Sequence, residues 1–228
     1  MPTSHFQCDL FAFLRDLKEN NDRAWFEENR DRYLASVRDP ALRFIVDFGE
    51  HLARISPHFR ADPRPTGGSM FRMHRDIRFA RDKSPYKTAV GLHFRHAAGK
   101  DAHTPGFYLH LEPRASFVGV GLWHPDTPTL AKLREAVVAD PAAWRQAVGG
   151  KRFSTAFTVS GDELVRVPRG YDPNHPLADV LRLKDYTAFA PLSQKQVTGA
   201  AFLGEFAKLC ADASPFMAWQ CGALGIPF

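Results

Sequence analysis

The stretch from residue 107 to residue 122 constrains the fold more than any other, because apolar residues alternate with other residues over two short runs. The runs Phe107–Glu112 and Phe117–Leu122 flank the turn sequence Pro113-Arg114-Ala115-Ser116. An alternation with a period of two is typical of a strand with one buried face. Two such runs around a short turn predict a β-hairpin, so we expect an antiparallel sheet in this protein.

The pairing register of this hairpin follows from its hydrophobic pattern. With an even loop, Glu112 lies opposite Phe117 and His110 lies opposite Gly119, which makes one face of the hairpin wholly apolar and supports this register. The other face carries Tyr108, His110 and Glu112 against two glycines. Glycine at these positions leaves space above the sheet or lets neighbouring aromatic rings lie flat on it.

Helical patterns lie on both sides of the predicted sheet in the sequence. Apolar residues at helical spacing predict helices before residue 56, between residues 127 and 149, and after residue 198. Further strands are predicted at 71–79, 88–95, 153–159, 164–167 and 186–191. Because no βαβ alternation is present, this order predicts an α+β fold, with a largely antiparallel sheet built from hairpins and packed by N-terminal and C-terminal helices.

The length of 228 residues suits one large domain. We expect a single domain over residues 1–228. It would comprise an N-terminal helical segment at about 5–56, a sheet-containing core at about 67–191 and C-terminal helices at about 193–225.

Residues 72–87, called the arginine segment below, carry a local excess of positive charge. The cations of this segment are Arg72, Arg75, Arg78, Arg81, Lys83 and Lys87, and its acids are Asp76 and Asp82. Between residues 69 and 96, seven lysines and arginines face two aspartates, a surplus equal to the +5 net charge of the whole chain. A uniformly basic nucleic-acid-binding protein would spread its charge further, so the positive field here is local.

Alternation across the predicted strand Phe71–Phe79, broken only by Arg75, places Arg72, His74, Asp76 and Arg78 on one face. Several guanidinium groups that converge on one surface bind phosphate or carboxylate groups bidentately. The predicted anion-binding residues are Arg72, Arg75, Arg78, Lys83 and Lys87, with Arg166 and Arg169 of a proline-rich loop as helpers. Alternatively, the arginines pair with Asp76, Asp82 or Glu112, and the segment is purely architectural.

His110 and Glu112 are the predicted catalytic residues. A carboxylate beside an imidazole orients the ring and favours its protonated form, so the pair suits general acid–base chemistry. A histidine two residues before a glutamate can also open a two-histidine, one-carboxylate metal site. That spacing is too common to be specific, and we assign no metal. The sequence has no Walker loop, dinucleotide fingerprint or G-x-S-x-G motif, and we expect no cofactor.

The three cysteines, Cys8, Cys210 and Cys221, form no C-x-x-C pair and suit reduced thiols in a cytoplasmic protein. No secretory signal is evident at the N-terminus, and no apolar run approaches the roughly 20 residues of a membrane span, so we expect no membrane association. Neither the oligomeric state nor a reaction follows from these features.

Three functions fit the arginine segment. The first is an enzyme or binding protein for a phosphorylated or carboxylated small molecule, with the cations holding the anion and the His110/Glu112 pair moving a proton. The second is a nucleic-acid-binding module that uses the same cations on phosphates. The third is a non-catalytic interaction protein with an architectural Arg/Asp network. The sequence leaves open whether the protein is an enzyme.

Several longer motifs resemble a widespread, mainly bacterial family of conserved hypothetical proteins, a domain of unknown function. They are RDIRFARDKSPYKT (Arg75–Thr88), PGFYLHLEP (Pro105–Pro113), GVGLWHPD (Gly119–Asp126) and RVPRGYDPNHP (Arg166–Pro176). NNDRAWFEENRDRY (Asn20–Tyr33) and PFMAWQCGALG (Pro215–Gly225) fit as well. The resemblance covers nearly the whole chain and implies a single-domain, cytosolic bacterial protein, but it implies no activity, substrate or catalytic residue.

Overall fold

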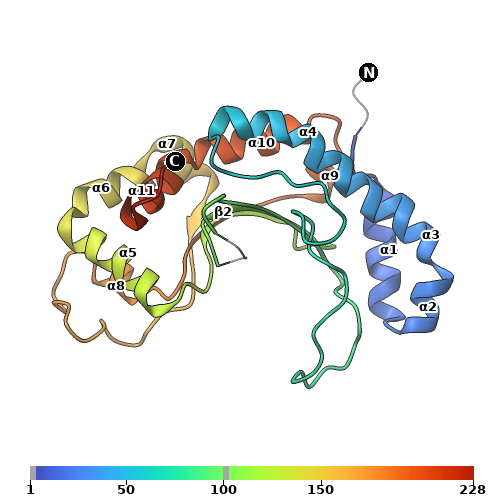
Figure 1. The fold of residues 1–228 in the computed structure, drawn as a ribbon, viewed down its shortest axis with the longest axis horizontal. Coiled ribbons are helices and arrows are strands. Elements are labelled where there is room, and N and C mark those ends of the chain that lie inside the picture. Colours follow the sequence, from blue (N-terminus) through green and yellow to red (C-terminus); the bar gives the residue numbers. More distant parts are fainter. Residues whose placement is uncertain (1–3, 100–102) are drawn as a thin grey trace.

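The structure is a computed structural model that describes residues 4–99 and 103–228. Its centre is a five-stranded antiparallel sheet with the strand order β1-β2-β3-β5-β4 (Figure 1). The strands are β1 (Val90–Arg95), β2 (Gly106–Leu111), β3 (Phe117–Leu122), β4 (Thr158–Val159) and β5 (Tyr186–Pro191). Helices before, within and after the strand region complete the fold, which confirms the predicted α+β class.

Helices surround the sheet on one face and at its two ends. The N-terminal helices are α1 (Cys8–Glu19), α2 (Arg23–Glu28), α3 (Arg30–Tyr33), the π-helical turn η1 (Leu34–Arg38) and α4 (Asp39–Ile55). The later helices are α5 (Thr127–Ala139), α6 (Pro141–Gly149), α7 (Lys151–Ala156), α8 (Ala178–Arg182), α9 (Gln194–Val197), α10 (Phe202–Asp212) and α11 (Ser214–Leu224).

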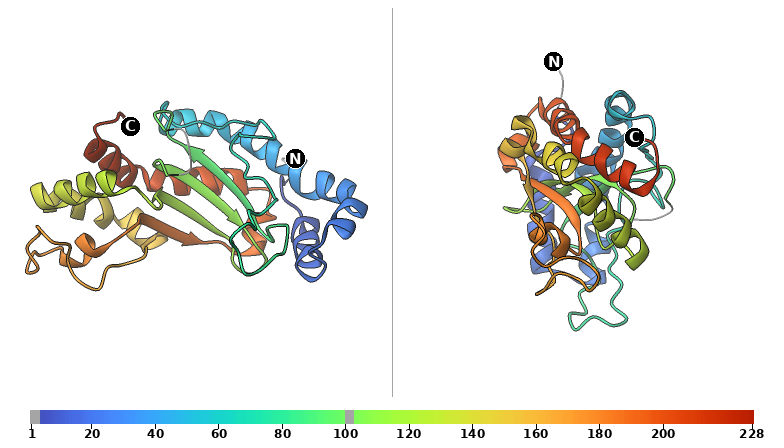
Figure 2. Two further views of the ribbon diagram at one scale, coloured as in Figure 1. Left: turned by 60° about the horizontal axis from the view of Figure 1, so that its bottom comes forward. Right: turned by 90° about the vertical axis from the view of Figure 1, so that its left-hand side faces the viewer.

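One face of the sheet is packed against helices α4 and α10 (Figures 1 and 2). The ring of Phe48 on α4 lies 4.6 Å from Phe94 on β1 and 4.7 Å from Phe206 on α10, measured between ring centroids. These three rings are fully buried. The burial of large aromatic side chains of this kind is a main source of stability. The core therefore lies between these helices and one face of the sheet, and the opposite face remains open.

The β2–β3 hairpin forms as predicted, but its register differs by two residues. Tyr108 lies opposite Gly119 and His110 lies opposite Phe117. The faces are unchanged, because a shift of two residues keeps every side chain on its own side. The reason lies in a wider turn: the hydroxyl of Ser116 accepts a hydrogen bond from the backbone N–H of Glu112 and donates one to its carbonyl. Glu112 is therefore not paired with Phe117.

The arginine segment is not a strand, contrary to the prediction. The chain bridges to β1 at Met70, opposite Leu92, and then forms a loop that begins at the buried Met73 and closes at Lys87, whose N–H donates to the carbonyl of Met73 at 2.7 Å. Between these residues it forms an extended loop, shown projecting from the sheet in Figure 1. At Phe79 the side chain is 95% exposed. The alternating apolar residues beyond Met73 lack a sheet to pack on, which explains why the pattern misled the prediction.

The strand predicted at 153–159 is mostly helix α7, followed by the short strand β4. Phe153 and Phe157 are four positions apart, and their rings stack with centroids 5.2 Å apart. The alternation in the sequence masked this helical spacing. The strand predicted at 164–167 is also absent, and the chain there makes one isolated bridge, between Glu163 and Leu183. The strands predicted at 88–95 and 186–191 correspond to β1 and β5.

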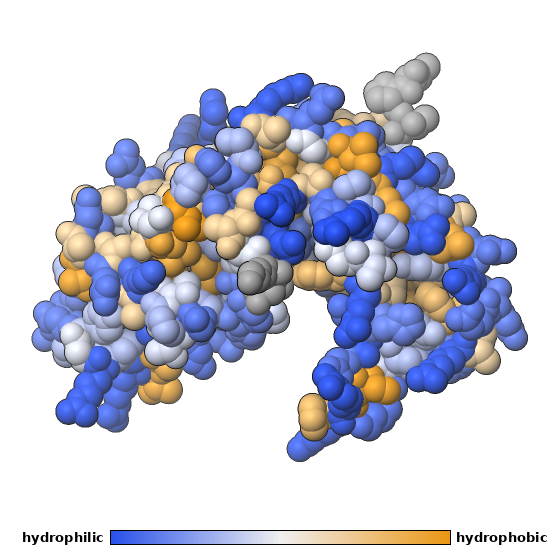
Figure 3. Space-filling view, in the orientation of Figure 1, coloured by the Kyte–Doolittle hydropathy of each residue, from blue (hydrophilic) through white to orange (hydrophobic). Residues whose placement is uncertain are grey.

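The open face of the sheet forms the roof of an arch. Helices α1 to α3 lie at one end of the arch and α5, α6 and α8 at the other (Figure 1). Figure 3 shows the resulting notch, with the mostly hydrophilic arginine segment projecting along one side. The polar and aromatic face of the β2–β3 hairpin, with Tyr108 and His110, lies on this open side of the sheet.

Candidate functional site

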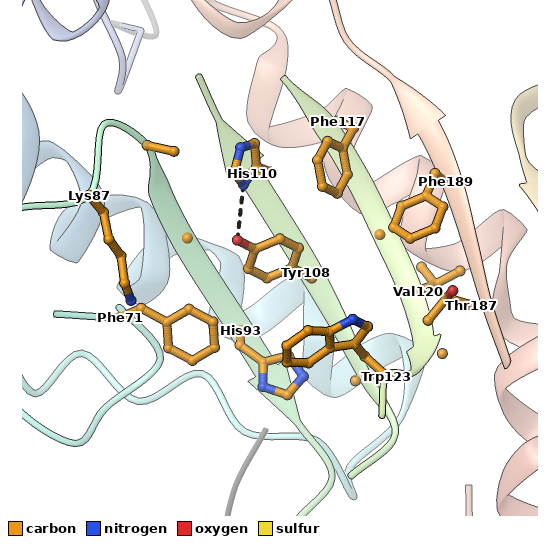
Figure 4. A pocket seen from close by; sticks show the side chains of 15 residues that line it. Phe71, Lys87, His93, Tyr108, His110, Phe117, Val120, Trp123, Thr187 and Phe189 are labelled. Carbon is orange, nitrogen blue, oxygen red and sulfur yellow. Dashed lines mark hydrogen bonds between the residues drawn. The ribbon is translucent and has the colours of Figure 1, made fainter. Parts of the chain in front are cut away.

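The open face of the sheet contains a cavity of about 520 Å³. Strands β1, β2, β3 and β5 provide its floor (Figure 4). Its rings come from Phe71, His93, Tyr108, His110, Phe117, Trp123 and Phe189, and Lys87 and Thr187 add polar groups. Small-molecule sites typically measure roughly 300–1,000 Å³ and combine apolar walls with a few polar groups. The size and lining of this cavity therefore suit one small molecule.

Two glycines allow the aromatic rings to lie across the floor. A Cβ atom at Gly91 would lie 2.6 Å from the hydroxyl oxygen of Tyr108, and a Cβ at Gly106 would lie 2.1 Å from Nε2 of His93. Either separation is too short for a carbon atom. The hairpin glycine Gly119 has a smaller effect, because a Cβ there would make ordinary contacts at 3.5 Å. Glycine thus makes room for aromatic rings above the sheet, as expected, but it does so chiefly at Gly91 on β1 and at Gly106 at the start of β2.

A hydrogen-bonded series runs along β2 from Glu112 to the cavity. Nε2 of His110 lies 3.1 Å from Oε2 of Glu112, and Nδ1 of His110 lies 3.0 Å from the hydroxyl of Tyr108 (Figure 4 shows the second bond). An ionised carboxylate only accepts hydrogen bonds, so Nε2 is the donor in the first bond. In a neutral imidazole the other nitrogen is then an acceptor, and Tyr108 donates to it. We call this series the Tyr108 relay.

The environment of Tyr108 keeps its phenol protonated. Burial, with a smaller contribution from the negative charge of Glu112, raises the pKa of Tyr108 to about 12. At neutral pH the hydroxyl therefore remains a hydrogen-bond donor to His110. Its oxygen retains lone pairs that can accept a hydrogen bond from a molecule in the cavity. The ring of His110 is fixed by stacking on Phe117, with centroids 4.7 Å apart and planes at 15°.

Lys87 places a positive charge at the edge of the cavity. Its ammonium nitrogen lies 5.3 Å from the centroid of the Phe71 ring, a cation–π distance. The side chain is partly buried. Burial lowers the pKa of Lys87, and the positive charge of Arg72 lowers it further. A negatively charged group beside Lys87 would therefore favour its protonated form and offset both the cost of desolvation and the repulsion by Arg72.

The structure does not bring the other predicted anion-binding residues into this cavity. Arg78 forms an ion pair with Asp76 at 2.6 Å, and Arg75 pairs with Asp82. Lys83 donates to the carbonyl of Ile77 at 3.0 Å. These contacts lie within the arginine segment, where Arg72, Arg78 and Lys83 are exposed. The alternative in which the arginines pair with Asp76 and Asp82 for a purely architectural role named the same partners. That alternative also required the arginines to be buried, and Arg78 is exposed.

Arg166 and Arg169 belong to the loop between β4 and α8, and both side chains are exposed. Figure 1 shows this loop at the end of the arch opposite to the arginine segment. The two arginines therefore do not converge with Lys87 on one anion, and neither lines the cavity.

A second histidine–carboxylate pair lies near the far end of the cavity floor, and the sequence pattern did not predict it. Asp185 is 3% exposed, and its Oδ1 accepts hydrogen bonds from the backbone N–H of His124 at 2.6 Å and from Nδ1 of that residue at 3.0 Å. The ring of Trp123, which lines the cavity, stacks on His124 with centroids 4.1 Å apart. His124 has a positive φ of 48°. The only sequence signal was His124 within the motif WHPD, and Asp185 lies 61 residues later.

The described residues, 4–99 and 103–228, contain no group of three or more His, Cys, Asp or Glu side chains placed to bind a metal ion. His110 and Glu112 are instead committed to the Tyr108 relay.

Within the same ranges, no helix has the length and apolar character needed to cross a membrane.

The fold and the cavity together define a class of protein. It is an α+β protein whose antiparallel sheet is packed by helices on one face and presents an aromatic, largely apolar cavity on the other. A model of the conserved hypothetical protein family DUF2461 matches residues 9–219, and the chain belongs to that family. This confirms the family resemblance of the sequence motifs. No curated protein and no solved structure matches the chain.

Proposed function

We propose that this protein binds one small molecule that combines a planar, largely apolar body with a carboxylate or phosphate group, and that it exchanges a proton with that molecule. The observation that carries the proposal is the Tyr108 relay, whose hydroxyl end lies on the floor of a cavity of ligand size. A partly buried, fully connected polar series is costly to maintain for packing alone, since each of its groups must be satisfied.

The planar body is inferred from the rings that line the cavity. Aromatic side chains favour stacked or edge-to-face contact with other rings. Phe71, Trp123, Phe117 and Phe189 are spread around the cavity on the open face of the sheet (Figure 4). A flat apolar molecule among these rings replaces water with ring contacts.

The anionic group is inferred from Lys87. This cation is the member of the predicted anion-binding set that lines the cavity. Partial burial strengthens its attraction for a negative charge, because fewer water molecules screen the interaction. The remaining predicted cations do not line this cavity.

The relay supplies a path for one proton. A ligand that gives its proton to the oxygen of Tyr108 allows this residue to pass its own proton to Nδ1 of His110. The imidazolium that forms is stabilised by the carboxylate of Glu112. Tyr108 remains a phenol throughout, as its raised pKa requires. The reverse sequence gives a proton to the ligand.

Two matched compounds test the binding. We expect 2-naphthoate to bind more tightly than neutral 2-naphthalenemethanol, and we expect Lys87→Gln to remove this preference while leaving the affinity for the alcohol unchanged. Lys195→Gln, a control at an exposed position on α9, should change neither affinity. Equal affinity of the wild type for both compounds would reject the anionic group, and no binding of either compound would reject the site.

A second candidate function is binding of single-stranded nucleic acid. The observation that favours it is the exposed tip of the arginine segment, where Phe79 is 95% exposed and the guanidinium carbon of Arg78 lies 6.0 Å from the centroid of its ring. Proteins that bind single strands typically stack the bases on aromatic side chains that lie among cations. This binding weakens steeply with salt. A gel-shift experiment at low salt that detects no complex with an oligonucleotide would reject this candidate.

A further inference from the structure

A second recess of about 440 Å³ adjoins the aromatic cavity and shares Lys87 with it. This recess lies between the end of α1 and the base of the arginine segment. Its charged and hydroxyl groups come from Lys18, Arg75, Lys87, Asp82, Ser84 and Thr88. The lining is mostly polar, whereas that of the first cavity is mostly apolar. One lysine therefore stands between an apolar site and a polar one.

The recess carries a surplus of positive charge. Three cations line it against one carboxylate, which leaves two positive charges. The carboxylate of Asp82 is itself engaged: Arg75 donates to one of its oxygens, and the backbone N–H and hydroxyl of Ser84 donate to the other at 2.9 and 2.6 Å. These bonds hold the pKa of Asp82 well below its usual range, so the charge is permanent at neutral pH. Asp82 fixes Arg75 in place and leaves a surplus that equals the charge of a phosphate dianion.

The backbone around the recess is anchored to the helical part of the fold. The side chain of Asn21 accepts a hydrogen bond from the N–H of Tyr86 and donates one to its carbonyl, both at 3.0 Å. The ring of Tyr86 stacks on Phe26 with centroids 4.0 Å apart, and the residue is 3% exposed. Lys87 follows directly and is held by its own bond to Met73. The shared cation is therefore presented by a fixed backbone, as a preorganised anion site requires.

The side chain of Lys87 lies between the two sites (Figure 4 shows it reaching toward Phe71). A ligand that fills the aromatic cavity with a ring and extends past Lys87 brings its other end into the recess. Lys18 and Arg75, which line the recess, would then contact that end. An ammonium group and a guanidinium group are the usual partners of phosphate oxygens.

We propose that this recess is a phosphate subsite and that the ligand is a phosphorylated aromatic small molecule, with its ring in the sheet cavity and its phosphate among Lys18, Arg75 and Lys87. The inference rests on the proposed function, because the ring must occupy the cavity for the phosphate to reach the recess. It narrows the anionic group to phosphate and adds Lys18, which no sequence pattern indicated. Arg75 keeps its predicted role here, with Asp82 as its support.

The test compares 2-naphthyl phosphate with neutral 2-naphthalenemethanol by fluorescence titration of the full chain. We expect the phosphate to bind at least about tenfold more tightly. Lys18→Gln and Arg75→Gln should each weaken its binding by about tenfold or more, without change for the alcohol. Lys18 is exposed near the end of α1, so this variant should fold normally. Lys195→Gln is the control and should alter neither affinity.

The outcomes separate this inference from the proposed function. If the alcohol fails to bind, the cavity is not the site of the ring and the proposed function fails. If the alcohol binds but the phosphate binds no better, or if Lys18→Gln and Arg75→Gln leave its affinity unchanged, the phosphate subsite alone is overturned. An oligonucleotide that binds more tightly than 2-naphthyl phosphate, with an affinity that falls steeply with salt, would overturn it in favour of nucleic acid.

Discussion

The hydroxyl group of Tyr108 lies 3.0 Å from Nδ1 of His110, two positions further along the same strand. Residues at this spacing share one face of a strand, so the contact follows from the sequence once β2 has formed. The ring orientations depend on other elements: Gly91 on β1 leaves room for the hydroxyl, and Phe117 on β3 stacks on the imidazole. The relay is thus local in sequence, but three strands are needed to align it.

Tyr108→Phe should lower the free energy of unfolding by about 1 kcal/mol, because the partly buried Nδ1 of His110 loses its donor. Glu112→Gln is the matched change at the other end of the relay. It keeps an oxygen that can accept from Nε2 of His110, so it should cost less. Urea unfolding of the two variants at pH 7 measures the difference. A larger loss for Glu112→Gln would show that the charge of Glu112, rather than the hydrogen bonds, stabilises the relay.

Gly91→Ala should displace the Tyr108 hydroxyl, because the new methyl group would lie 2.6 Å from it and 2.9 Å from the ring of Phe71. We expect a loss of about 1–3 kcal/mol in stability, as for other overpacked sites. Gly119→Ala is the control on the same face, where a methyl group meets its neighbours at 3.5 Å. It should change stability by less than about 1 kcal/mol. Equal losses for the two variants would contradict the close approach at Gly91.

The faces of the hairpin could be predicted from the sequence, but its register could not. Alternation over 107–122 identifies which side chains share a face, and the structure confirms this for Tyr108 and His110. The hydrogen bonds of Ser116 that widen the turn leave no mark on the hydrophobic pattern, and they move the pairing by two residues. An alternating pattern determines which face of the sheet each side chain occupies, but it is the same after a shift of the pairing by two residues.

The candidate site could be predicted only in part, because its remaining members meet through tertiary contacts. His110 and Glu112 are local and were identified together. Lys87 was predicted as one of seven anion-binding residues, but its position at the cavity depends on where the arginine segment leaves the sheet. Lys18 lies 69 positions earlier on a helix with an ordinary amphipathic pattern. No spacing rule relates such residues.

Asn21→Ala should loosen the base of the arginine segment, because both of its hydrogen bonds to the backbone of Tyr86 are lost. We expect a cost of about 1–3 kcal/mol. Faster amide exchange is expected at Tyr86, whose N–H loses its acceptor. Asn20→Ala is the control, since that exposed side chain bonds only to the carbonyl of Asp16 within the described structure. Hydrogen exchange resolved by residue measures the effect. Unchanged protection at Tyr86 would show that Asn21 does not anchor the segment.

The stability of the protein should fall as the pH rises from about 10 to about 12. Burial raises the pKa of Tyr33 and Tyr108 from 10.0 to about 12, and it also raises that of Tyr86 and Tyr186. In this window the unfolded chain releases phenol protons that the folded chain retains, so each pH step favours unfolding. The stability is fully present below pH 10. A shift of two pH units corresponds to up to about 3 kcal/mol for one tyrosine.

Urea unfolding at pH 8, 9.5 and 11 checks this expectation. Tyr108→Phe should flatten the decline, because one of the shifted groups is removed. A decline of the same steepness in the variant would mean that Tyr108 ionises at its ordinary pKa in the folded protein, which would contradict its raised pKa in the relay.

Asp185→Asn should destabilise the junction between β3 and β5 more than His124→Ala does. One oxygen of Asp185 accepts two hydrogen bonds from His124, and the other accepts one from the N–H of Asp162 at 3.2 Å. An asparagine retains one oxygen, so its amide group must face at least one of these N–H donors from a buried position, at a cost of about 2–3 kcal/mol. His124→Ala removes only the hydrogen bond from the imidazole and keeps the one from the backbone N–H. We therefore expect it to lower the free energy of unfolding by about 1 kcal/mol. Chemical denaturation ranks the two variants, and the reverse order would show that the imidazole, rather than the two backbone N–H groups, is the principal partner of Asp185.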